Sequence, residues 1–547
     1  MVLRNQKVKF VVLIFISIFS FGLIWTMVVP ANNEAPDEAA HVDMITFLKR
    51  NHRIPVFNRE TEIIPTQYSQ SLLSGAYYSM AYISPVAYLP YLPLYPNTTS
   101  DLSKLAVLAD RVVSAFFVGL FTVFLFLGLF NLDPKKEKQA LAATLFIALF
   151  PQVIFAAGYI NVESPALFLM ALSFYFYTRL SISNTIKSGM TVLEIGKYLT
   201  FGSIFFGLSI GLLGLMKANY LIFVGFLILL IIFDVVKAKD RLSEINKYLG
   251  PAVLFIAVNV WWWIRNVNLY HDPLILGYIK REIIAKAPDW LLTPRMQGYN
   301  LFTIFGNHYF AKFTFLGFFA NLGGANIFLP TIFYVLFFVI IISLILIAFL
   351  STLKRGLKGK RAQALACEKH AEAWTTRKRS PGFSLLTDPN SKYLVSFSII
   401  LIASLLYFAS KNLDDFSPQG RHLFPLLLPL AIIIFIGLGN LPTKISKFSF
   451  TLPAFSLIAS LYGLFLTLDK YYVKGTIYIN QSNMGKYLPD FSWRHPSLAG
   501  FRSLYVMLDL PSGAGWAILS LSLVLILSLV LVYSSTFNNQ VSKGLIS

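Results

Sequence analysis

The most constraining feature of this sequence is a series of long apolar runs without charge. Residues 10–33 and 313–353 contain no charged side chain at all. A helix needs about 20 apolar residues to cross roughly 30 Å of bilayer hydrocarbon, so each run is long enough to span a membrane. Only 13% of the 547 residues are charged, against about 25% in a soluble domain. These features exclude a soluble enzyme, a disordered chain and a disulfide scaffold, and they predict a polytopic membrane protein. The single cysteine, Cys367, permits no intramolecular disulfide.

The runs predict an all-α polytopic membrane protein, in which residues 1–547 form a single transmembrane domain of about twelve helices. The expected spans are 10–30, 111–131, 140–158, 164–180, 198–216, 219–235, 248–264, 331–351, 393–410, 422–441, 449–467 and 514–534. The first is longer than the apolar part of a signal peptide, so we expect an anchor. Residues 198–233 would make one helix of about 54 Å, so two spans are expected, with Lys217 and Asn219 in the turn. The run 313–353 is expected to hold one span, beginning after Pro330.

Basic residues predict the orientation, because cytoplasmic loops carry the excess of Lys and Arg. The loop 352–392 holds ten of them, which places it and both termini in the cytoplasm. Segments 31–110, 265–330, 411–421 and 468–513 are then extracytoplasmic. Prolines and tyrosines crowd the first of these, which predicts a surface loop with short interfacial helices rather than a span. The net charge of +20 therefore follows mostly from topology. The basic loops are expected to contact anionic membrane lipids, and no nucleic-acid partner is expected.

Ionisable residues next to the spans fall repeatedly at the expected outer ends. They are the acids Asp37, Glu38 and Glu163 and the cations Lys217, Arg265 and Arg421. A proton-coupled transporter more often places such groups near the membrane midplane. A cluster at one face instead favours a site at the outer interface, which a lipid headgroup and an external substrate can both reach.

The run Pro-Asp-Glu-Ala-Ala-His at 36–41 offers a general base. Pro36 suits the first turn of a helix, and the acids Asp37 and Glu38 suit its positive end. That placement keeps a carboxylate ionised, as a general base requires. Asp37 and His41 are four residues apart and share a helix face. Spacing alone favours the other interpretation, which is plain helix capping.

The other candidates also have structural alternatives. Glu163 and Asn161 lie in a short loop, where an acid often simply begins a helix. Lys217 could simply lie at the membrane interface and extend its ammonium group toward water. Arg265 and Asn266 follow three tryptophans, which are typical of a membrane boundary. An arginine at 421, next to His422, could form a bidentate contact with a phosphate or anchor the span at the interface. The seven scattered histidines predict no zinc site.

Taken in order along the chain, these stretches resemble the polytopic GT-C glycosyltransferases, which include protein O-mannosyltransferases and the lipid A aminoarabinose transferase. Within them the chain most resembles a widespread, poorly characterised group of bacterial membrane proteins. The resemblance rests on residues 36–41, on Trp-Ile-Arg-Asn at 263–266 with Tyr-His-Asp-Pro at 270–273, on residues 317–330 and on Gln-Gly-Arg-His-Leu-Phe-Pro at 419–425. The sequence departs from the pattern at His271, His422 and Glu163, where glycine, tyrosine and aspartate are more usual.

The resemblance implies inverting transfer of a sugar from a polyprenyl-phosphate-linked donor to a glycan, lipid or protein acceptor. The reaction is expected on the extracytoplasmic face of a bacterial plasma membrane. Asp37, or next Glu38, would be the general base, while Lys217, Arg265 and Arg421 would hold the lipid phosphate.

The same resemblance gives Glu163 a role beside the acceptor or a divalent cation, Mg²⁺ or Mn²⁺, although no metal is required. The expected substrate-binding residues also include His41, Asn161, Asn266 and His422. Three alternatives stay open. One is a lipid-linked oligosaccharide flippase or exporter, which the uncharged spans argue against. The others are a glycan polymerase or ligase and a non-catalytic scaffold that recruits partners through the basic loop.

Overall fold

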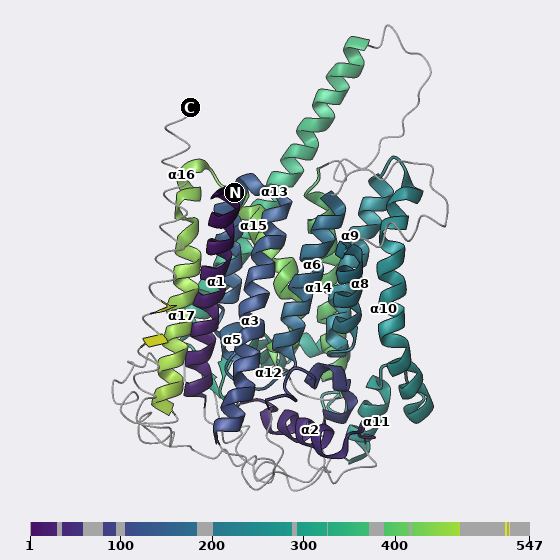
Figure 1. The fold of residues 1–547 in the computed structure, drawn as a ribbon. Helices are drawn as coiled ribbons and strands as arrows, with labels where there is room; N and C mark the ends of the chain where they lie inside the picture. Colours follow the sequence, from purple (N-terminus) through teal and green to yellow (C-terminus); the bar gives the residue numbers. More distant parts are fainter. Residues whose placement is uncertain are drawn as a thin grey trace.

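The computed structural model describes residues 2–29, 35–57, 80–94, 104–182, 201–286, 293–324, 326–370, 388–414, 418–470, 520–521 and 524–525. These residues form the predicted all-α membrane fold (Figure 1). The long helices are α1 (Val2–Val28), α3 (Lys104–Leu132), α6 (Glu163–Ile182), α9 (Leu221–Lys237), α10 (Arg241–Tyr270), α13 (Thr331–His370), α14 (Ser391–Asn412), α15 (Leu427–Gly439) and α17 (Thr451–Leu468). Shorter helices are α4 (Glu137–Ala148), α5 (Pro151–Ala156), α8 (Phe201–Gly214) and α16 (Thr443–Ser446).

The count of twelve spans is not confirmed. In the described part of the chain, eight helices are long and apolar enough to cross a membrane. The expected span 140–158 is broken between α4 and α5, because Pro151 starts a new helix. The helix α8 has 14 residues, fewer than a full span needs. Most of the expected span 514–534 lies outside the described residues.

Both long runs are divided as the sequence predicted. Residues 198–233 separate into α8 and α9, with Lys217 and the short 3-10 helix η5 (Ala218–Tyr220) between them. The run 313–353 contains one long apolar helix, α13, which begins directly after Pro330. Before it lie α12 (His308–Phe319) and an antiparallel hairpin of β1 (Asn321–Leu322) and β2 (Ile327–Phe328). The hairpin was not predicted, because two-residue strands leave no periodicity in the sequence.

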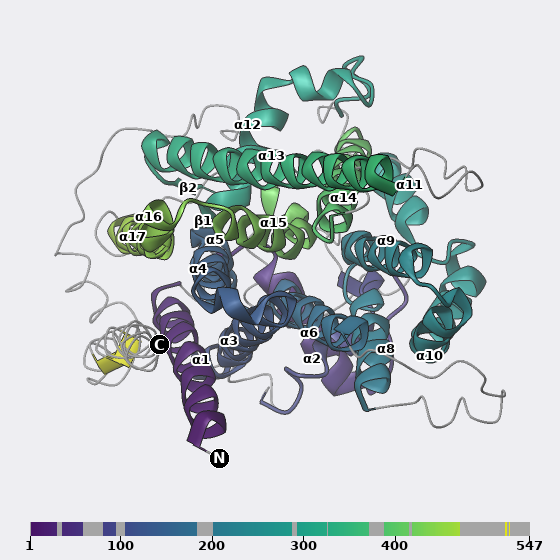
Figure 2. The same cartoon turned by 90° about the horizontal axis from the view of Figure 1, so that it is seen from above.

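The helices pack in two connected groups (Figure 2). In one group α1 packs on α3, α3 on α6, α6 on α8, and α8 on α10. In the other, α15 packs against α13, α14 and α4, and α17 packs against α4. The helix α4 also contacts α3 and so joins the groups. The apolar span that contains α15 is 89% buried, whereas that of α10 is 22% buried. We therefore place α15 at the centre and α10 at the lipid-facing edge.

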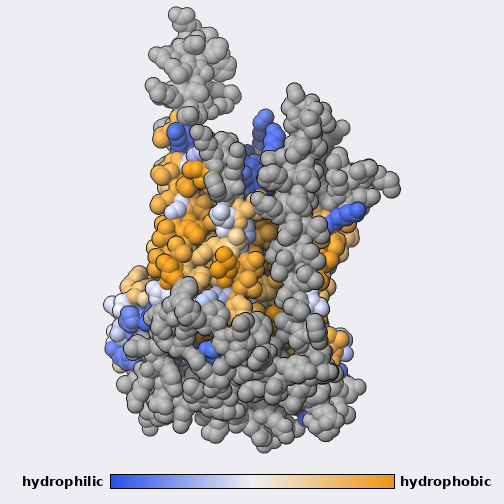
Figure 3. Space-filling model, turned by 90° about the vertical axis from the view of Figure 1, so that its left-hand side faces the viewer, coloured by the Kyte–Doolittle hydropathy of each residue, from blue (hydrophilic) through white to orange (hydrophobic). Residues whose placement is uncertain are grey.

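The outer surface has the pattern of an integral membrane protein. Side chains spaced three or four residues apart on α10, namely Val253, Ile256, Val260 and Ile264, are exposed and apolar. Figure 3 shows the same pattern on another face, where hydrophobic residues form a band across the middle. An exposed apolar band of this kind suits contact with lipid.

The two ends of the bundle differ. The N-terminus and the far end of α13 lie at one end (Figure 1). At the other end lie α2 (Glu38–Asn51), α11 (Leu276–Lys286) and α12, all short helices. The loop ahead of α3 adds two 3-10 helices, η1 (Met80–Tyr82) and η2 (Pro85–Tyr88). A third, η8 (Gly420–Leu426), leads into α15.

Candidate active site

The start of α2 is held by a buried ion pair. Glu38, the first residue of α2, accepts hydrogen bonds from Arg111 of α3, at 2.7 Å from Nε and 2.6 Å from Nη2. Arg111 also donates to the carbonyl oxygens of Thr26 and Val29 at the end of α1. The backbone N–H of Ile160 donates to Glu38 as well. This pair therefore joins α1, α2, α3 and the loop that leads to α6.

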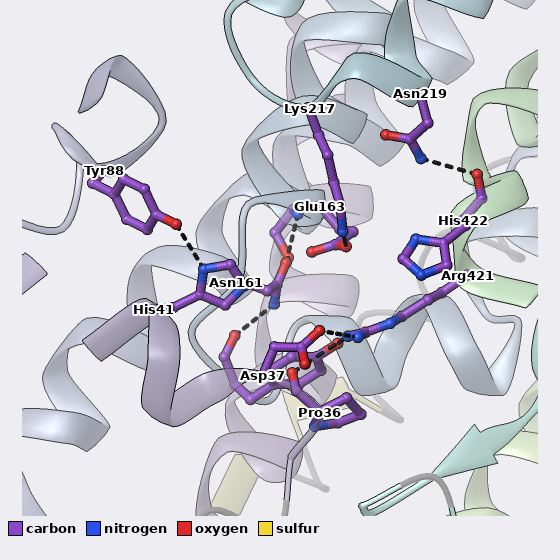
Figure 4. A network of polar contacts seen from close by, with 12 residues as sticks. Pro36, Asp37, His41, Tyr88, Asn161, Glu163, Lys217, Asn219, Arg421 and His422 are labelled. Carbon is purple, nitrogen blue, oxygen red and sulfur yellow. Dashed lines mark hydrogen bonds and ion pairs between the residues drawn. The ribbon is translucent and has the colours of Figure 1, made fainter. Parts of the chain in front are cut away.

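Asp37 precedes α2 and directs its carboxylate away from that helix. Its backbone is left-handed, with a φ of 63°, a conformation that aspartate tolerates better than most residues. The side chain makes no capping hydrogen bond. Instead it accepts a charge-assisted hydrogen bond from Nη2 of Arg421, 384 positions later in the chain (Figure 4). Helix capping, which spacing favoured, is therefore not what this carboxylate does.

Arg421 reaches Asp37 from η8. Its Nη1 donates to the hydroxyl of Tyr159 at 2.9 Å and to the carbonyl oxygen of Pro36 at 3.3 Å. The adjacent Gly420 packs so tightly on α12 that a Cβ there would collide with the backbone of that helix. Only glycine allows this approach, and the approach fixes where the Arg421 side chain begins.

A second ion pair lies beside the first. Glu163, at the start of α6, accepts a hydrogen bond from Nζ of Lys217 at 2.8 Å. Their side chains are 2% and 12% exposed, so Lys217 points into the protein rather than along the interface. The second carboxylate oxygen of Glu163, Oε2, is buried and has no hydrogen-bond partner among the described residues.

The two pairs lie close enough to affect one another. Burial raises the pKa of Asp37, but Arg421 and then Lys217 more than offset it, so the pKa falls below its usual value. Burial likewise raises the pKa of Glu163, while Lys217 and Arg421 bring it well below the usual range. Both carboxylates are therefore ionised at neutral pH.

His41 completes the polar cluster, a term we use for Asp37, His41, Glu163, Lys217 and Arg421 (Figure 4). Its Nδ1 lies 2.9 Å from the hydroxyl of Tyr88. Burial lowers the pKa of His41 from 6.5 to about 4, although Glu163 and Asp37 act to raise it. The imidazole is therefore neutral near pH 7, and the cluster contains two acids balanced by two cations.

Two other candidates, Asn161 and His422, make hydrogen bonds that involve backbone groups next to the cluster. Asn161 uses its amide within its own loop: Nδ2 donates to the carbonyl oxygens of Ala156 and Tyr159, and Oδ1 accepts from Ser164. The carbonyl oxygen of His422 accepts a hydrogen bond from Asn219 at 2.9 Å. Asn161 thus shapes the loop before Glu163, and this contact of His422 joins η8 to the turn at Lys217.

The structure places Arg265 and Asn266 apart from the cluster, at the end of α10. The guanidinium of Arg265 lies over the ring of Trp262 and donates to the carbonyl oxygen of Pro55 at 2.7 Å. The amide of Asn266 donates to the carbonyl oxygen of Pro273. Arg265 also donates to Oδ1 of Asn266 and lies near the ring of Tyr270, so none of these contacts involves the polar cluster. It braces the first long loop against α10.

Residues of the site that were missed from the sequence include Arg111, Tyr88 and Tyr159. Arg111 was counted only as the edge of a span, although a charge inside an apolar helix is itself a signal of a buried partner. Tyr159, which holds Arg421, has no distinguishing signal in a chain with 27 tyrosines. In the part of the chain that the structure describes, no three His, Cys, Asp or Glu side chains gather where they could hold a metal ion.

One protein-family model matches part of the chain. Residues 81–272, about a third of the chain, match the family model of the dolichyl-phosphate-mannose-protein mannosyltransferases, a GT-C family. The predicted resemblance to GT-C glycosyltransferases is thereby confirmed. No curated protein and no solved structure matches the chain. The matched segment contains Glu163 and Lys217, whereas Asp37 and Arg421 lie on either side of it.

Proposed function

We propose that this membrane protein, with its GT-C segment at residues 81–272, transfers a sugar from a polyprenyl-phosphate-linked donor to a hydroxyl group of a glycan, lipid or protein. The reaction would take place at the extracytoplasmic face, where the end of the bundle that carries α2 would lie. The observation that carries the proposal is the pairing of Asp37 with Arg421 beside the pair of Glu163 with Lys217. One base and two cations at the end of a membrane bundle suit a donor whose phosphate and sugar reach the membrane surface while its lipid chain stays in the bilayer.

The cations would bind the donor phosphate. Arg421 pairs with Asp37 and Lys217 pairs with Glu163 within one cluster (Figure 4), so we place one phosphate in contact with both cations. A guanidinium can bind two phosphate oxygens at once, and an ammonium adds a compact charge. Arg265 has other partners, so the clamp that we propose has two cations rather than the three that the sequence suggested.

Asp37 would act as the general base. In the absence of donor, Arg421 holds the pKa of its carboxyl below the usual range, which makes it a weak base. A phosphate that draws Arg421 toward itself removes part of that stabilisation, so the pKa of Asp37 should rise on donor binding. The base would therefore gain strength when the donor is in place. Glu38, held by Arg111, would position Asp37 rather than accept a proton.

The transfer would proceed with inversion. The acceptor oxygen gives its proton to Asp37 and forms a bond to the anomeric carbon. The bond from that carbon to the phosphate oxygen breaks, and its electron pair leaves with the polyprenyl phosphate. Arg421 and Lys217 would stabilise the charge that develops on the leaving oxygen.

The proposal can be tested with purified protein in nanodiscs and labelled polyprenyl-phosphate-mannose, offered with peptide, lipid and glycan acceptors. Wild type should release polyprenyl phosphate and label one acceptor class. Asp37→Asn is nearly isosteric and should lower the rate by about 10²–10⁴-fold.

A matched control is Asp133→Asn, which changes an acid in a half-exposed pair with Lys136 and should leave the rate unchanged. Full activity of Asp37→Asn would exclude Asp37 as the base. If wild type moved intact lipid-linked sugar across the membrane without releasing polyprenyl phosphate, the protein would be a flippase.

A further inference from the structure

A buried carboxylate just after α14 is bound by two cations from outside that helix. Asp414 lies in the connection from α14 to η8, and its side chain is 3% exposed. Arg295 donates to both of its oxygens, at 2.6 Å from Nε and 3.1 Å from Nη2. Nζ of Lys280, on α11, lies 2.5 Å from Oδ2. Both carboxylate oxygens of Asp414 therefore have cationic partners, and we call these three residues the latch.

The backbone adds to this junction. The N–H of Arg295 donates to the carbonyl oxygen of Leu413 at 3.0 Å, so the turn at Arg295 lies directly against the end of α14. Burial raises the pKa of Asp414, but the hydrogen bonds from Arg295 and Lys280 more than offset it, and the pKa falls below its usual value. The latch is therefore an ionised, charge-assisted contact at neutral pH.

The segment that begins at the latch contacts the same connection a second time. Residues 293–319, which we call the arm, end with α12. Gly420 packs on α12 so closely that a Cβ there would collide with the backbone of that helix. The arm therefore contacts the connection from α14 to η8 at both of its ends, at Asp414 through Arg295 and at Gly420 through α12. Arg421 follows directly after the second contact.

We propose that the latch positions Arg421 for the transfer reaction, which makes Asp414 a positioning residue. The inference rests on the proposed function, in which Arg421 leaves Asp37 and binds the donor phosphate. With the connection held at both ends, the Arg421 side chain starts from a fixed point. If the latch opened, the arm and the connection could shift together, and the guanidinium would lose its alignment with the phosphate. Asp414 thus acts through Arg421 and does not touch the donor.

The geometry of the latch suits a positioning role. Lys280 and Arg295 are 45% and 54% exposed, and an ion pair in contact with solvent contributes little to stability. A bidentate pair of an arginine with a carboxylate fixes orientation as well as distance, because two parallel hydrogen bonds define it. Loss of Arg295 should therefore change the placement of the arm more than the stability of the fold.

The test compares the two ends of α14, because a similar pair lies before that helix. Asp388 is also 3% exposed and accepts from Nε of a half-exposed arginine, Arg355, at 2.5 Å. Asp414→Asn and its control Asp388→Asn therefore remove the same kind of carboxylate from opposite ends of one helix. Arg295→Ala and its control Arg355→Ala form a milder pair. In Arg295→Ala the buried carboxylate keeps Lys280, so this variant should fold even if Asp414→Asn does not.

Each variant is measured in nanodiscs, well below its unfolding temperature, for binding of polyprenyl phosphate and for kcat/KM with polyprenyl-phosphate-mannose. Misplacing a group by about 1 Å can lower a rate by about 10²-fold, so kcat/KM should fall by about 10–10²-fold in Asp414→Asn. The affinity for polyprenyl phosphate should fall in the same variant. Arg295→Ala should change both quantities in the same direction but by less. Asp388→Asn and Arg355→Ala should match wild type in both measurements.

A second measurement separates positioning of Arg421 from a general loss of structure. Asp414→Asn is combined with Arg421→Lys, and kcat/KM is compared with that of each single variant. If Asp414 acts through Arg421, the lysine has already lost the alignment that the latch provides. The combined loss should then be smaller than the product of the two single losses.

Two results would refute the role of the latch while leaving the proposed function intact. One is binding and transfer by Asp414→Asn and Arg295→Ala that match those of their controls. The other is a combined loss in Asp414→Asn with Arg421→Lys that equals the product of the single losses, since Asp414 would then act by another route. Failure of wild type to bind polyprenyl phosphate or to transfer sugar from any donor would instead refute the proposed function, and the role of the latch with it.

Discussion

Replacing Glu38 by glutamine should destabilise the protein, because the buried guanidinium of Arg111 would lose the Glu38 carboxylate that accepts two of its hydrogen bonds. The two side chains are 4% and 0% exposed, and two hydrogen bonds join them. Removing one partner of a buried ion pair typically costs about 3–5 kcal/mol, since the remaining charge is left uncompensated. The half-exposed pair of Asp133 with Lys136 supplies the control, because a surface pair contributes about 0–1 kcal/mol.

The assay is thermal unfolding of purified protein in detergent, and unfolding is monitored as the loss of monodisperse protein on heating. Glu38→Gln should unfold at a clearly lower temperature than Asp133→Asn. The double change Glu38→Gln with Arg111→Met leaves no buried charge, so it should recover part of the loss. Activity measured well below the unfolding temperature should fall in Glu38→Gln because Asp37, the next residue, is no longer held in place.

A different outcome would restore the catalytic role that the sequence suggested for Glu38. If Glu38→Gln were as stable as Asp133→Asn and still inactive, its carboxylate would be needed for the reaction and not for the fold. An equal loss of stability in Glu38→Gln and in the double variant would also contradict the reasoning, because it would mean that leaving Arg111 charged after the loss of Glu38 costs nothing.

Three further predictions concern the clamp, the pH dependence and the orientation. Arg421→Lys keeps the charge but loses the bidentate geometry, so the affinity for polyprenyl phosphate should fall in a direct binding measurement. Burial lowers the pKa of His41 from 6.5 to about 4 in the folded protein. Between these two pH values, His41 therefore binds a proton in the unfolded chain but not in the folded one. Stability from this group is fully present above about pH 6.5 and is lost as the pH falls toward 4, so His41→Gln should flatten unfolding temperature against pH over that range. Met296→Cys, at an exposed position before α12, should react with an impermeant thiol reagent in intact cells, whereas native Cys367 should not; labelling of Cys367 from outside would invert the proposed orientation.

The fold could be predicted to the extent that single residues interrupt long apolar runs. Lys217 marks the turn between α8 and α9, and Pro330 marks the start of α13, because a charge or a proline is costly inside a span. The break between α4 and α5 was missed although Pro151 is visible in the sequence. Hydropathy averages over a window, and a proline flanked by apolar residues hardly changes the average.

The candidate site could be predicted only as a position along the membrane normal. Charges next to span ends correctly suggested that Asp37 and Arg421 belong to one end of the bundle. The same reasoning included Arg265, because Arg265 also follows a span. Position next to a span end says nothing, however, about how far apart two helices lie in the plane of the membrane. The structure supplies that distance: α10 lies at the edge of the bundle, and η8 leads into α15, in the most buried of the eight candidate spans found among the described residues.

The arrangement of the cluster changes how a phosphate clamp should work. Cations gathered for a phosphate would repel each other if they were unpaired, but Arg421 and Lys217 each contact a carboxylate. Buried cations with such partners are stable without a ligand. A phosphate must then compete with Asp37 and Glu163 for them, and this competition moderates the affinity for the donor. Because the contact that Arg421 would give to the phosphate is the one that weakens Asp37 as a base, donor binding and activation of the acceptor are coupled through one arginine.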